Sequence, residues 1–314
     1  MIVCVAGNPS IDKLFVVERL RPGEIHRPID FVQVPGGKGL NVARAAATLG
    51  AHVRVAAVLC GHAGRWIEQA LGEEGVAGRF VRGPGESRSS LSVADRETKR
   101  LTEFYEEGSP IDESAWLELE GAVRGLLPDT SWLTISGSVP PGAPVHGYGR
   151  VIRAARDAGV RSALDARGRA LAMGIAAGPD VVKVNAAEAA ELLGRPVQSE
   201  ADALAAAAHL RRLAGLQGRA GLVTRGPEGV VLAAPDGSQW SGRLDAWGPY
   251  AVGSGDAFLA GVVSALDAGA EWPEPLSSGL AAAAANAEVP GAGRLLRSRV
   301  EELARGATVN RVER

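Results

Sequence analysis

Gly253-Ser254-Gly255-Asp256, followed by Ala257-Phe258-Leu259-Ala260-Gly261-Val262-Val263, sets a turn of small residues directly in front of an apolar helical pattern. We expect consecutive backbone N–H groups to point outward where this helix begins. Such a helix start attracts the negative charge of a phosphate. Asp256 would lie in the first turn, where the helix dipole keeps a carboxylate ionised. Taken alone, however, this segment suits a structural helix cap better than a catalytic centre.

Two better-known phosphate-binding patterns are absent. The P-loop pattern Gly-x-x-x-x-Gly-Lys-Ser/Thr does not occur, because Lys38 is followed by Gly39 and lacks the upstream glycine. In the late motif, Phe258 occupies the position of the third glycine of a dinucleotide-binding loop. The sequence therefore supports neither a P-loop ATPase nor a Rossmann dehydrogenase.

Around the helix that carries Asp256, short Val-, Ile- and Leu-rich runs alternate with longer Ala-rich helical patterns. The expected strands are Met1–Ala6, Val53–Leu59, Trp132–Ser136, Arg161–Asp165, Val181–Val184 and Gly221–Thr224. The expected helices are Leu40–Leu49, Trp66–Leu71, Glu113–Leu127, Val145–Ala158, Ala186–Leu193 and Ala201–Leu213. Apolar runs of this length fit strands buried on both faces of a parallel sheet. The alternation predicts a doubly wound α/β sandwich, with residues 1–314 forming one domain.

Two further sets of short strands do not fit this alternation. Val230–Ala233 and Gln239–Gly242, joined by the Pro235-Asp236-Gly237 turn, predict an antiparallel hairpin at a sheet edge. The other set is Leu14–Glu18 with Asp30–Val34 and Leu91–Ala94 with Leu101–Tyr105. This second set, within about 12–35 and 88–106, predicts a small β-sheet beside the main body. A flap over a site is one use of such a sheet, and a surface excursion is the alternative.

The composition narrows the classes of partner and the compartment. Lys and Arg total 34 against 36 Asp and Glu, a net charge of −2, so neither nucleic acid nor an anionic membrane surface is expected to bind. Cys4 and Cys60 lie in apolar strand-like runs, which predicts buried free thiols. No apolar run approaches the length of a membrane helix, so we expect a cytoplasmic protein.

A second glycine-rich segment lies near the amino terminus, at Pro35-Gly36-Gly37-Lys38-Gly39-Leu40-Asn41-Val42-Ala43. Its glycines allow the backbone to approach a ligand closely, and Asn41 offers a donor and an acceptor to sugar hydroxyls. Lys38 adds a mobile positive charge. On its own, the segment fits a tight strand-to-helix turn equally well.

Together, the two glycine-rich segments resemble the two sequence signatures of the PfkB carbohydrate kinases, the ribokinase-like family. Further similar segments follow in the family's order: Asn8-Pro9-Ser10-Ile11-Asp12, Ser136–Gly142, Asn185-Ala186-Ala187-Glu188, Thr224-Arg225-Gly226-Pro227-Glu228-Gly229 and Ala284–Gly293. Independent caps and turns do not explain so many matches in one order. The resemblance implies a ribokinase-like three-layer αβα sandwich with a mainly parallel, doubly wound sheet and a small β-sheet lid.

The resemblance also implies a set of roles for residues of this chain. Asp256 would take the proton of the acceptor hydroxyl, and Gly253, Ser254 and Gly255 would form the anion hole for the phosphoryl group of ATP. The remaining implied roles are sugar binding by Asp12, Gly37, Asn41 and Ser138, nucleotide binding by Thr224, Gly226, Gly229 and Asn286, and Mg²⁺ binding through water by Asn185 and Glu188.

Three cations indicate that the acceptor already carries a phosphate. Lys38, Arg27 and Arg88 match basic positions of the family's fructose-1-phosphate and tagatose-6-phosphate kinase branch. The leading hypothesis is a 1-phosphofructokinase-like enzyme that converts fructose 1-phosphate to fructose 1,6-bisphosphate. A tagatose-6-phosphate or fructose-6-phosphate kinase is the nearest alternative, because Ser87 and Ser90 depart from the branch's Thr-Arg-x-Asn.

A hypothesis of another class is a sugar- or nucleotide-binding regulator without turnover, against which the intact Gly253-Ser254-Gly255-Asp256 speaks. The lid strands lead us to expect a homodimer formed through the lid, as the resemblance implies.

Overall fold

The computed structural model describes residues 1–215, 218–246 and 248–313, and every site residue predicted from the sequence lies within these ranges. Two β-sheets are present in this part of the chain, one of ten strands and one of four. Among the described residues, no helix combines the length and the apolar character needed to cross a membrane.

The ten-stranded sheet forms the centre of the molecule. Its strands in spatial order are β14 (Thr308–Arg311), β13 (Gln239–Arg243), β12 (Val230–Ala233), β11 (Ala220–Thr224), β10 (Val181–Asn185), β9 (Arg161–Asp165), β8 (Trp132–Ser136), β1 (Ile2–Ala6), β4 (Val53–Cys60) and β5 (Ala77–Gly83). Neighbouring strands are parallel from β5 to β11, and antiparallel from β11 to β14. The mainly parallel sheet predicted from the apolar runs is confirmed.

The predicted hairpin is present, but its place at the sheet edge was wrong. Strands β12 and β13 pair around the Pro235-Asp236-Gly237 turn as expected. Strand β14 then pairs with β13 on its outer side, so β14 forms this edge of the sheet. Thr308–Arg311 gave no strand signal because it is short and polar, and three of its four residues are exposed.

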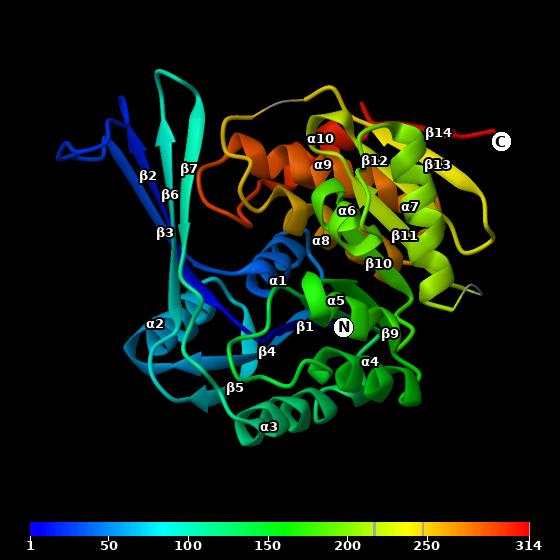
Figure 1. The fold of residues 1–314 in the computed structure, drawn as a ribbon, viewed down its shortest axis with the longest axis horizontal. Helices are drawn as coiled ribbons and strands as arrows, with labels where there is room; N and C mark the ends of the chain where they lie inside the picture. The colour runs from blue at the N-terminus through cyan, green and yellow to red at the C-terminus, as the bar shows by residue number, and fades with distance from the viewer. Residues whose placement is uncertain (216–217, 247, 314) are drawn as a thin grey trace.

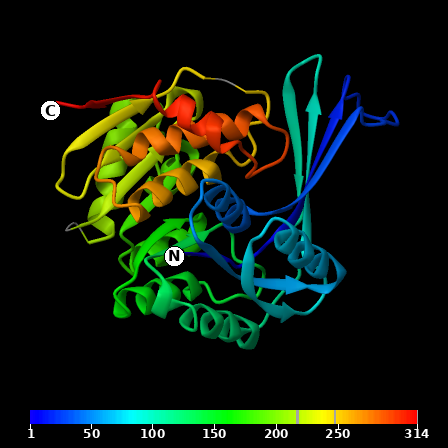
Figure 2. The ribbon, with the colours of Figure 1, turned by 180° about the vertical axis from the view of Figure 1, so that it is seen from behind.

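Helices cover both faces of the central sheet. One face carries α1 (Lys38–Thr48), α2 (Gly61–Glu73), α8 (Ser254–Asp267), α9 (Pro275–Glu288) and α10 (Arg297–Ala304). The other carries α3 (Glu113–Arg124), α4 (Gly147–Asp157), α5 (Gly168–Ile175), α6 (Ala186–Leu193) and α7 (Glu200–Leu213). Each set packs on its own apolar cluster, one on either side of the strands. Figures 1 and 2 show the resulting three layers, which confirm the predicted αβα sandwich.

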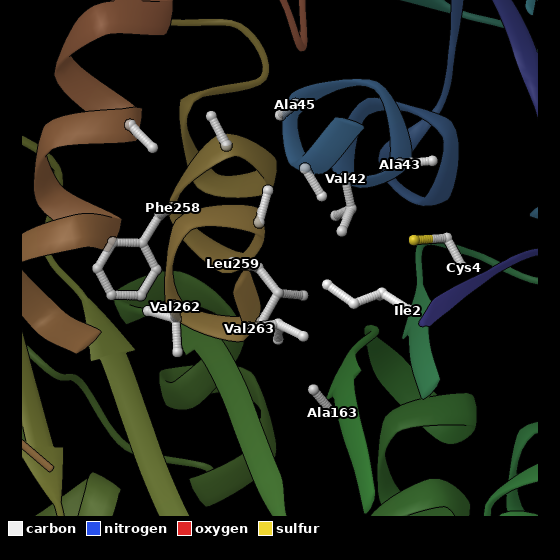
Figure 3. Packing of buried hydrophobic residues seen from close by; sticks show 14 of the residues in the cluster. Ile2, Cys4, Val42, Ala43, Ala45, Ala163, Phe258, Leu259, Val262 and Val263 are labelled. Atoms are coloured by element: carbon white, nitrogen blue, oxygen red, sulfur yellow. The ribbon is translucent and has the colours of Figure 1, made fainter. Parts of the chain in front are cut away.

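Helix α8, which carries Asp256, is held by apolar contacts on two sides. Figure 3 shows Leu259 and Val263 pointing toward Ile2 of β1 and Ala163 of β9, with α1 alongside. On its other side α8 meets α9 closely, because a Cβ on Gly279 of α9 would lie 2.7 Å from the Val262 side chain. Dense packing of this kind fixes the start of α8 relative to the sheet.

The four-stranded sheet is the predicted lid. Its order is β3 (Asp30–Gly36), β2 (Ser10–Val17), β6 (Arg88–Asp95) and β7 (Arg100–Tyr105), with β2 and β6 parallel and the outer pairs antiparallel. In Figure 1 this sheet rises beside the sandwich, next to α1 and α2. The two cysteines are buried free thiols, as predicted.

Candidate active site

A cavity of about 980 Å³ lies where the central strands end and the lid begins. It is lined by residues at the carboxyl ends of β1, β8, β10 and β11, which is where open α/β sheets bind ligands. The predicted site residues that line it are Asp12, Gly37, Lys38, Asn41, Arg88, Ser138, Asn185, Glu188, Thr224, Gly226, Gly229, Gly253, Ser254, Gly255 and Asp256. Segments nearly 250 residues apart in the sequence thus meet in one place, as the resemblance implied.

Asp256 lies in the first turn of α8 at the floor of this cavity. Only 6% of the residue is exposed, and Asn41 Nδ2 donates a hydrogen bond of 2.8 Å to its Oδ2. Burial raises the pKa of Asp256 to about 7; the nearby Asp165 carboxylate also raises it, while Lys38, Lys183 and the Asn41 bond oppose the rise. A carboxyl group with a pKa near neutrality is well suited to accept a proton from a hydroxyl group.

The turn before α8 presents backbone donors to the cavity, though not all of those expected. Gly253 caps the helix with φ 82°, a left-handed conformation that glycine adopts readily. The N–H of Ser254 donates to the Ala251 carbonyl at 3.1 Å, so this donor is already taken. Within the described residues the N–H groups of Gly253 and Gly255 have no such partner, so these two can bind an anion.

A buried cluster of charges adjoins these donors. Asp165, at the end of β9, accepts from Lys38 Nζ and from Lys183 Nζ, each at 2.6 Å. Lys38 Nζ also donates to Glu188 Oε1 at 2.9 Å. Burial alone would raise the pKa of Asp165, but the two ammonium groups hold it below its usual range. Burial likewise opposes the charge of Lys38, yet Asp165, Glu188 and Asp256 raise its pKa above the usual range.

Lys183 is a site residue that the sequence analysis missed. A Cβ on Gly255 would lie 3.0 Å from Lys183 Nζ, so this ammonium group lies beside the free backbone donors. The signal in the sequence is a lysine in the middle of the apolar run Val181–Val184. Lys183 is only 2% exposed, and a buried charge without a functional or paired role is rare.

The lid side of the cavity carries the predicted sugar-binding residues. Asp12 Oδ2 accepts from the Gly37 N–H at 3.2 Å, and burial raises the pKa of Asp12. Gly36 must be glycine here, because a Cβ would lie 2.0 Å from Asp12 Cγ. Ser138 accepts at Oγ from Asn8 Nδ2 at 3.2 Å, which joins the loops after β1 and β8.

Asn185 and Glu188 form a capping box at the start of α6. Asn185 Oδ1 accepts from the Glu188 N–H at 2.8 Å, and Glu188 Oε2 accepts from the Asn185 N–H at 2.9 Å. In the part of the chain that the structure describes, no three His, Cys, Asp or Glu side chains cluster as metal ligands. Both carboxylate oxygens of Glu188 accept hydrogen bonds, from Lys38 Nζ and the Asn185 N–H, so these residues fit Mg²⁺ through the waters that this ion keeps rather than by direct ligation.

Two predicted site residues do not line the cavity. Asn286 is fully buried, where its Nδ2 donates to the Val252 carbonyl at 2.9 Å and its Oδ1 accepts from the Gly293 N–H at 2.8 Å. Asn286 therefore holds two loops together behind the cavity. Arg27 is exposed in the loop between β2 and β3 and is absent from the cavity lining.

Comparison with known proteins identifies the family. A model described as pfkB family carbohydrate kinase matches residues 2–299. The chain belongs to the pfkB family. It is an ATP-dependent carbohydrate kinase, as the sequence motifs predicted.

This pfkB kinase is similar to three relatives over most of its length. A 1-phosphofructokinase from Haloferax volcanii is 33% identical over 283 residues, which cover 89% of this chain and 88% of the relative. Phosphofructokinase-2 from Escherichia coli, solved in complex with fructose-6-phosphate, is 26% identical with a TM-score of 0.86, covering 97% and 98% of the two chains. A possible 1-phosphofructokinase from Thermotoga maritima shares the fold at 22% identity, with a TM-score of 0.88 and 99% of both chains covered.

Proposed function

We propose that this pfkB kinase transfers the γ-phosphate of ATP to a hydroxyl group of a ketohexose phosphate, with fructose 1-phosphate as the preferred acceptor. The observation that carries the proposal is the placement of Asp256 beside Asn41 and the free N–H groups of the turn before α8. The 1-phosphofructokinase relative supports the choice of acceptor. Fructose 6-phosphate, which the Escherichia coli structure contains, and tagatose 6-phosphate are the alternatives.

The proposed reaction is an in-line displacement at the γ-phosphorus. The oxygen of the acceptor hydroxyl forms a bond to phosphorus, its proton passes to an oxygen of Asp256, and the bond to the β–γ bridging oxygen breaks to release ADP. The N–H groups of Gly253 and Gly255 and the ammonium group of Lys183 would stabilise the charge on the transferring group.

The part of the cavity lined by α9, β12 and the segment after β13 has the character of a nucleotide site. Apolar side chains of α9 form one wall, including Leu280, Ala283 and Ala284, and Val230 and Leu244 line the same region. An apolar slot of this kind suits the flat surface of a purine base. The turn that contains Thr224, Gly226 and Gly229 lines the same cavity, and we assign it to the phosphates of ATP.

Mg²⁺ would be held through water by Asn185 and Glu188, together with the phosphates of ATP. When bound, the ion supplies positive charge that offsets the charge of the phosphates. Glu188 also positions Lys38, through the contact of 2.9 Å between Oε1 and Nζ. At the acceptor end we assign Asp12, Gly37, Asn41 and Ser138 to sugar hydroxyls, and Lys38 and Arg88 to the acceptor phosphate.

A panel of acceptors tests this function by coupled detection of ADP release. Fructose 1-phosphate, fructose 6-phosphate, tagatose 6-phosphate, fructose, ribose and adenosine are compared at equal concentration with saturating ATP and Mg²⁺. We expect the highest kcat/KM with fructose 1-phosphate. A preference for ribose or adenosine would contradict the proposed acceptor class. Tight binding without turnover on any acceptor would instead favour a regulator.

We further propose a homodimer formed through the lid. Large apolar side chains are exposed on the lid and its loop: Ile25 is 89% exposed, Phe31 52% and Phe104 59%. Exposed apolar groups gathered in one region are typical of protein interfaces. A lid-mediated dimer would also bring Arg27 near a second subunit, since Arg27 lies in the lid loop between β2 and β3.

Light scattering coupled to size exclusion tests the dimer. We expect the wild type at twice the 32.4 kDa of one chain and Phe31→Glu at the mass of one chain. Leu296→Glu is the matched control, because Leu296 is 63% exposed but lies outside the lid, before α10. A wild-type mass of one chain would refute the dimer.

A further inference from the structure

Arg167 is a further cationic residue that lines the cavity. It follows the last residue of β9 by two positions and stands at the N-cap of α5. Asp165, two residues earlier, is the carboxylate that holds Lys38 and Lys183. Among the described residues, Arg167 makes no side-chain hydrogen bond and no ion pair within 4.0 Å. A cationic side chain thus points its unused donors at the site of a charged substrate.

The topology brings Arg167 to the acceptor end of the cavity. Strands β1, β8 and β9 are neighbours in the sheet, and the loops that follow them carry Asn8, Ser138 and Arg167. Neighbouring strands are about 4.8 Å apart, so the first and third of these loops are separated by roughly 10 Å. Hydrogen bonds join the three loops, from Asn8 Nδ2 to Ser138 Oγ at 3.2 Å and from the Gly137 N–H to the Asp165 carbonyl at 2.8 Å.

Arg88 reaches the same place from the lid. Its Nε donates to the Asn8 carbonyl at 3.3 Å, and its Nη1 donates to Ser90 Oγ at 2.9 Å. No carboxylate of the described residues lies within 4.0 Å of either Arg88 or Arg167, although Glu106 and Glu107 line the same rim. Burial lowers the pKa of Arg88; the Asp12 carboxylate opposes this shift, and the positive charge of Arg167 adds to it. Arg88 and Arg167 thus line the same cavity, and among the described residues neither forms an ion pair.

We propose that Arg167 and Arg88 form a two-sided clamp for the phosphate that the sugar acceptor already carries. The inference rests on the proposed function and adds a specificity-determining residue to it. Guanidinium groups bind phosphate through paired, charge-assisted hydrogen bonds, and two of them on opposite sides fix its position. Fixing that phosphate would set which hydroxyl group of the sugar faces Asp256. The clamp therefore discriminates sugar phosphates from free sugars.

Arg167→Ala tests the clamp, with Arg169→Ala as the matched control on the same helix. Arg169 is also exposed but does not line the cavity. For R167A we expect the KM for fructose 1-phosphate to rise by about 10- to 100-fold, with the KM for ATP within about twofold of wild type. R169A should keep the wild-type KM for fructose 1-phosphate and for ATP. In R88A/R167A the fold-increase in the KM for fructose 1-phosphate should differ from the product of the two single-variant increases, because both residues would contact one phosphate.

The outcomes separate this inference from the proposed function. If the wild type phosphorylates fructose 1-phosphate and R167A keeps the wild-type KM for it, the clamp is refuted while the function stands. The same holds if R167A and R169A raise the KM equally, since a general charge effect would then explain both. If the wild type phosphorylates only free sugars, both the function and the clamp are refuted.

Discussion

Replacing Asp256 by asparagine is expected to lower kcat by about 10²- to 10⁴-fold while ATP still binds, because the acceptor hydroxyl loses its proton acceptor. Asparagine keeps the size of the side chain, and its amide can still form a hydrogen bond with Asn41 across the contact of 2.8 Å seen for Asp256. Coupled ADP release gives kcat, and titration with ATP gives the affinity. D256N is best compared with Asp157→Asn, an exposed position at the end of α4. A kcat near wild type would show that Asp256 is not the base.

The same variant is expected to be more stable than the wild type at alkaline pH. The pKa of Asp256 is raised from 3.8 to about 7, so between these values the folded state keeps a proton that the unfolded state has released. The free energy of unfolding of the wild type therefore falls as the pH rises from 3.8 to about 7, by at most about 4 kcal/mol. D256N has no such group, so its Tm should exceed that of the wild type at pH 8 by more than at pH 5. Equal differences at both pH values would contradict the raised pKa.

The second large effect is expected for Asp165→Ala. This fully buried carboxylate pairs with Lys38 and Lys183 at 2.6 Å each, and its loss leaves the buried ammonium group of Lys183 without this partner, while Lys38 keeps Glu188. Removing one member of a buried ion pair costs about 3–5 kcal/mol. Urea unfolding should show this loss in the free energy of unfolding, and kcat should fall because Lys183 leaves its place beside Gly255. Glu113→Gln is the control, because it removes an exposed ion pair with Arg150. It should lower the free energy of unfolding by less than about 1 kcal/mol.

A double variant distinguishes the charge network from simple loss of packing. Lys183→Met in the D165A background removes the ammonium group whose one carboxylate partner among the described residues was Asp165, while Lys38 keeps Glu188. We expect D165A/K183M to recover part of the lost stability without recovering activity. If the second substitution lowers stability further, the buried charges are not the cause of the destabilisation.

The order of the main elements was predictable from the sequence, because their signals are local. Strands buried on both faces appear as short apolar runs, and the helices between them follow the spacing of one buried face. Strand β5 was missed because Arg79 and Arg82 interrupt its apolar residues, which an edge strand tolerates. Helix α5 was missed because its run of Gly168–Ile175 is short and begins with glycine. These elements are defined by their neighbours more than by their own residues.

The site was predictable where the chemistry lies in a motif. Asn41 and Asp256 belong to the two glycine-rich segments and Asp12 to the segment Asn8–Asp12, and the structure brings all three to one cavity. Lys183 was missed because its function depends on β9 and α8, which a reading of one strand cannot supply. Asn286 lies in a matching segment, but the closeness of Val252 and Gly293 turns its side chain inward. Tertiary contacts thus decide which polar residues of a motif face the ligand.

Identification of the product of a single turnover tests the central claim most directly. Enzyme in excess over ATP is mixed with fructose 1-phosphate and Mg²⁺, and the products are resolved by ³¹P nuclear magnetic resonance. We predict stoichiometric ADP and fructose 1,6-bisphosphate, and no bisphosphate with D256N in the same time. Release of inorganic phosphate in place of the bisphosphate, or ATP left unreacted by the wild type, would contradict the proposal that this pfkB kinase phosphorylates a sugar phosphate with Asp256 as its base.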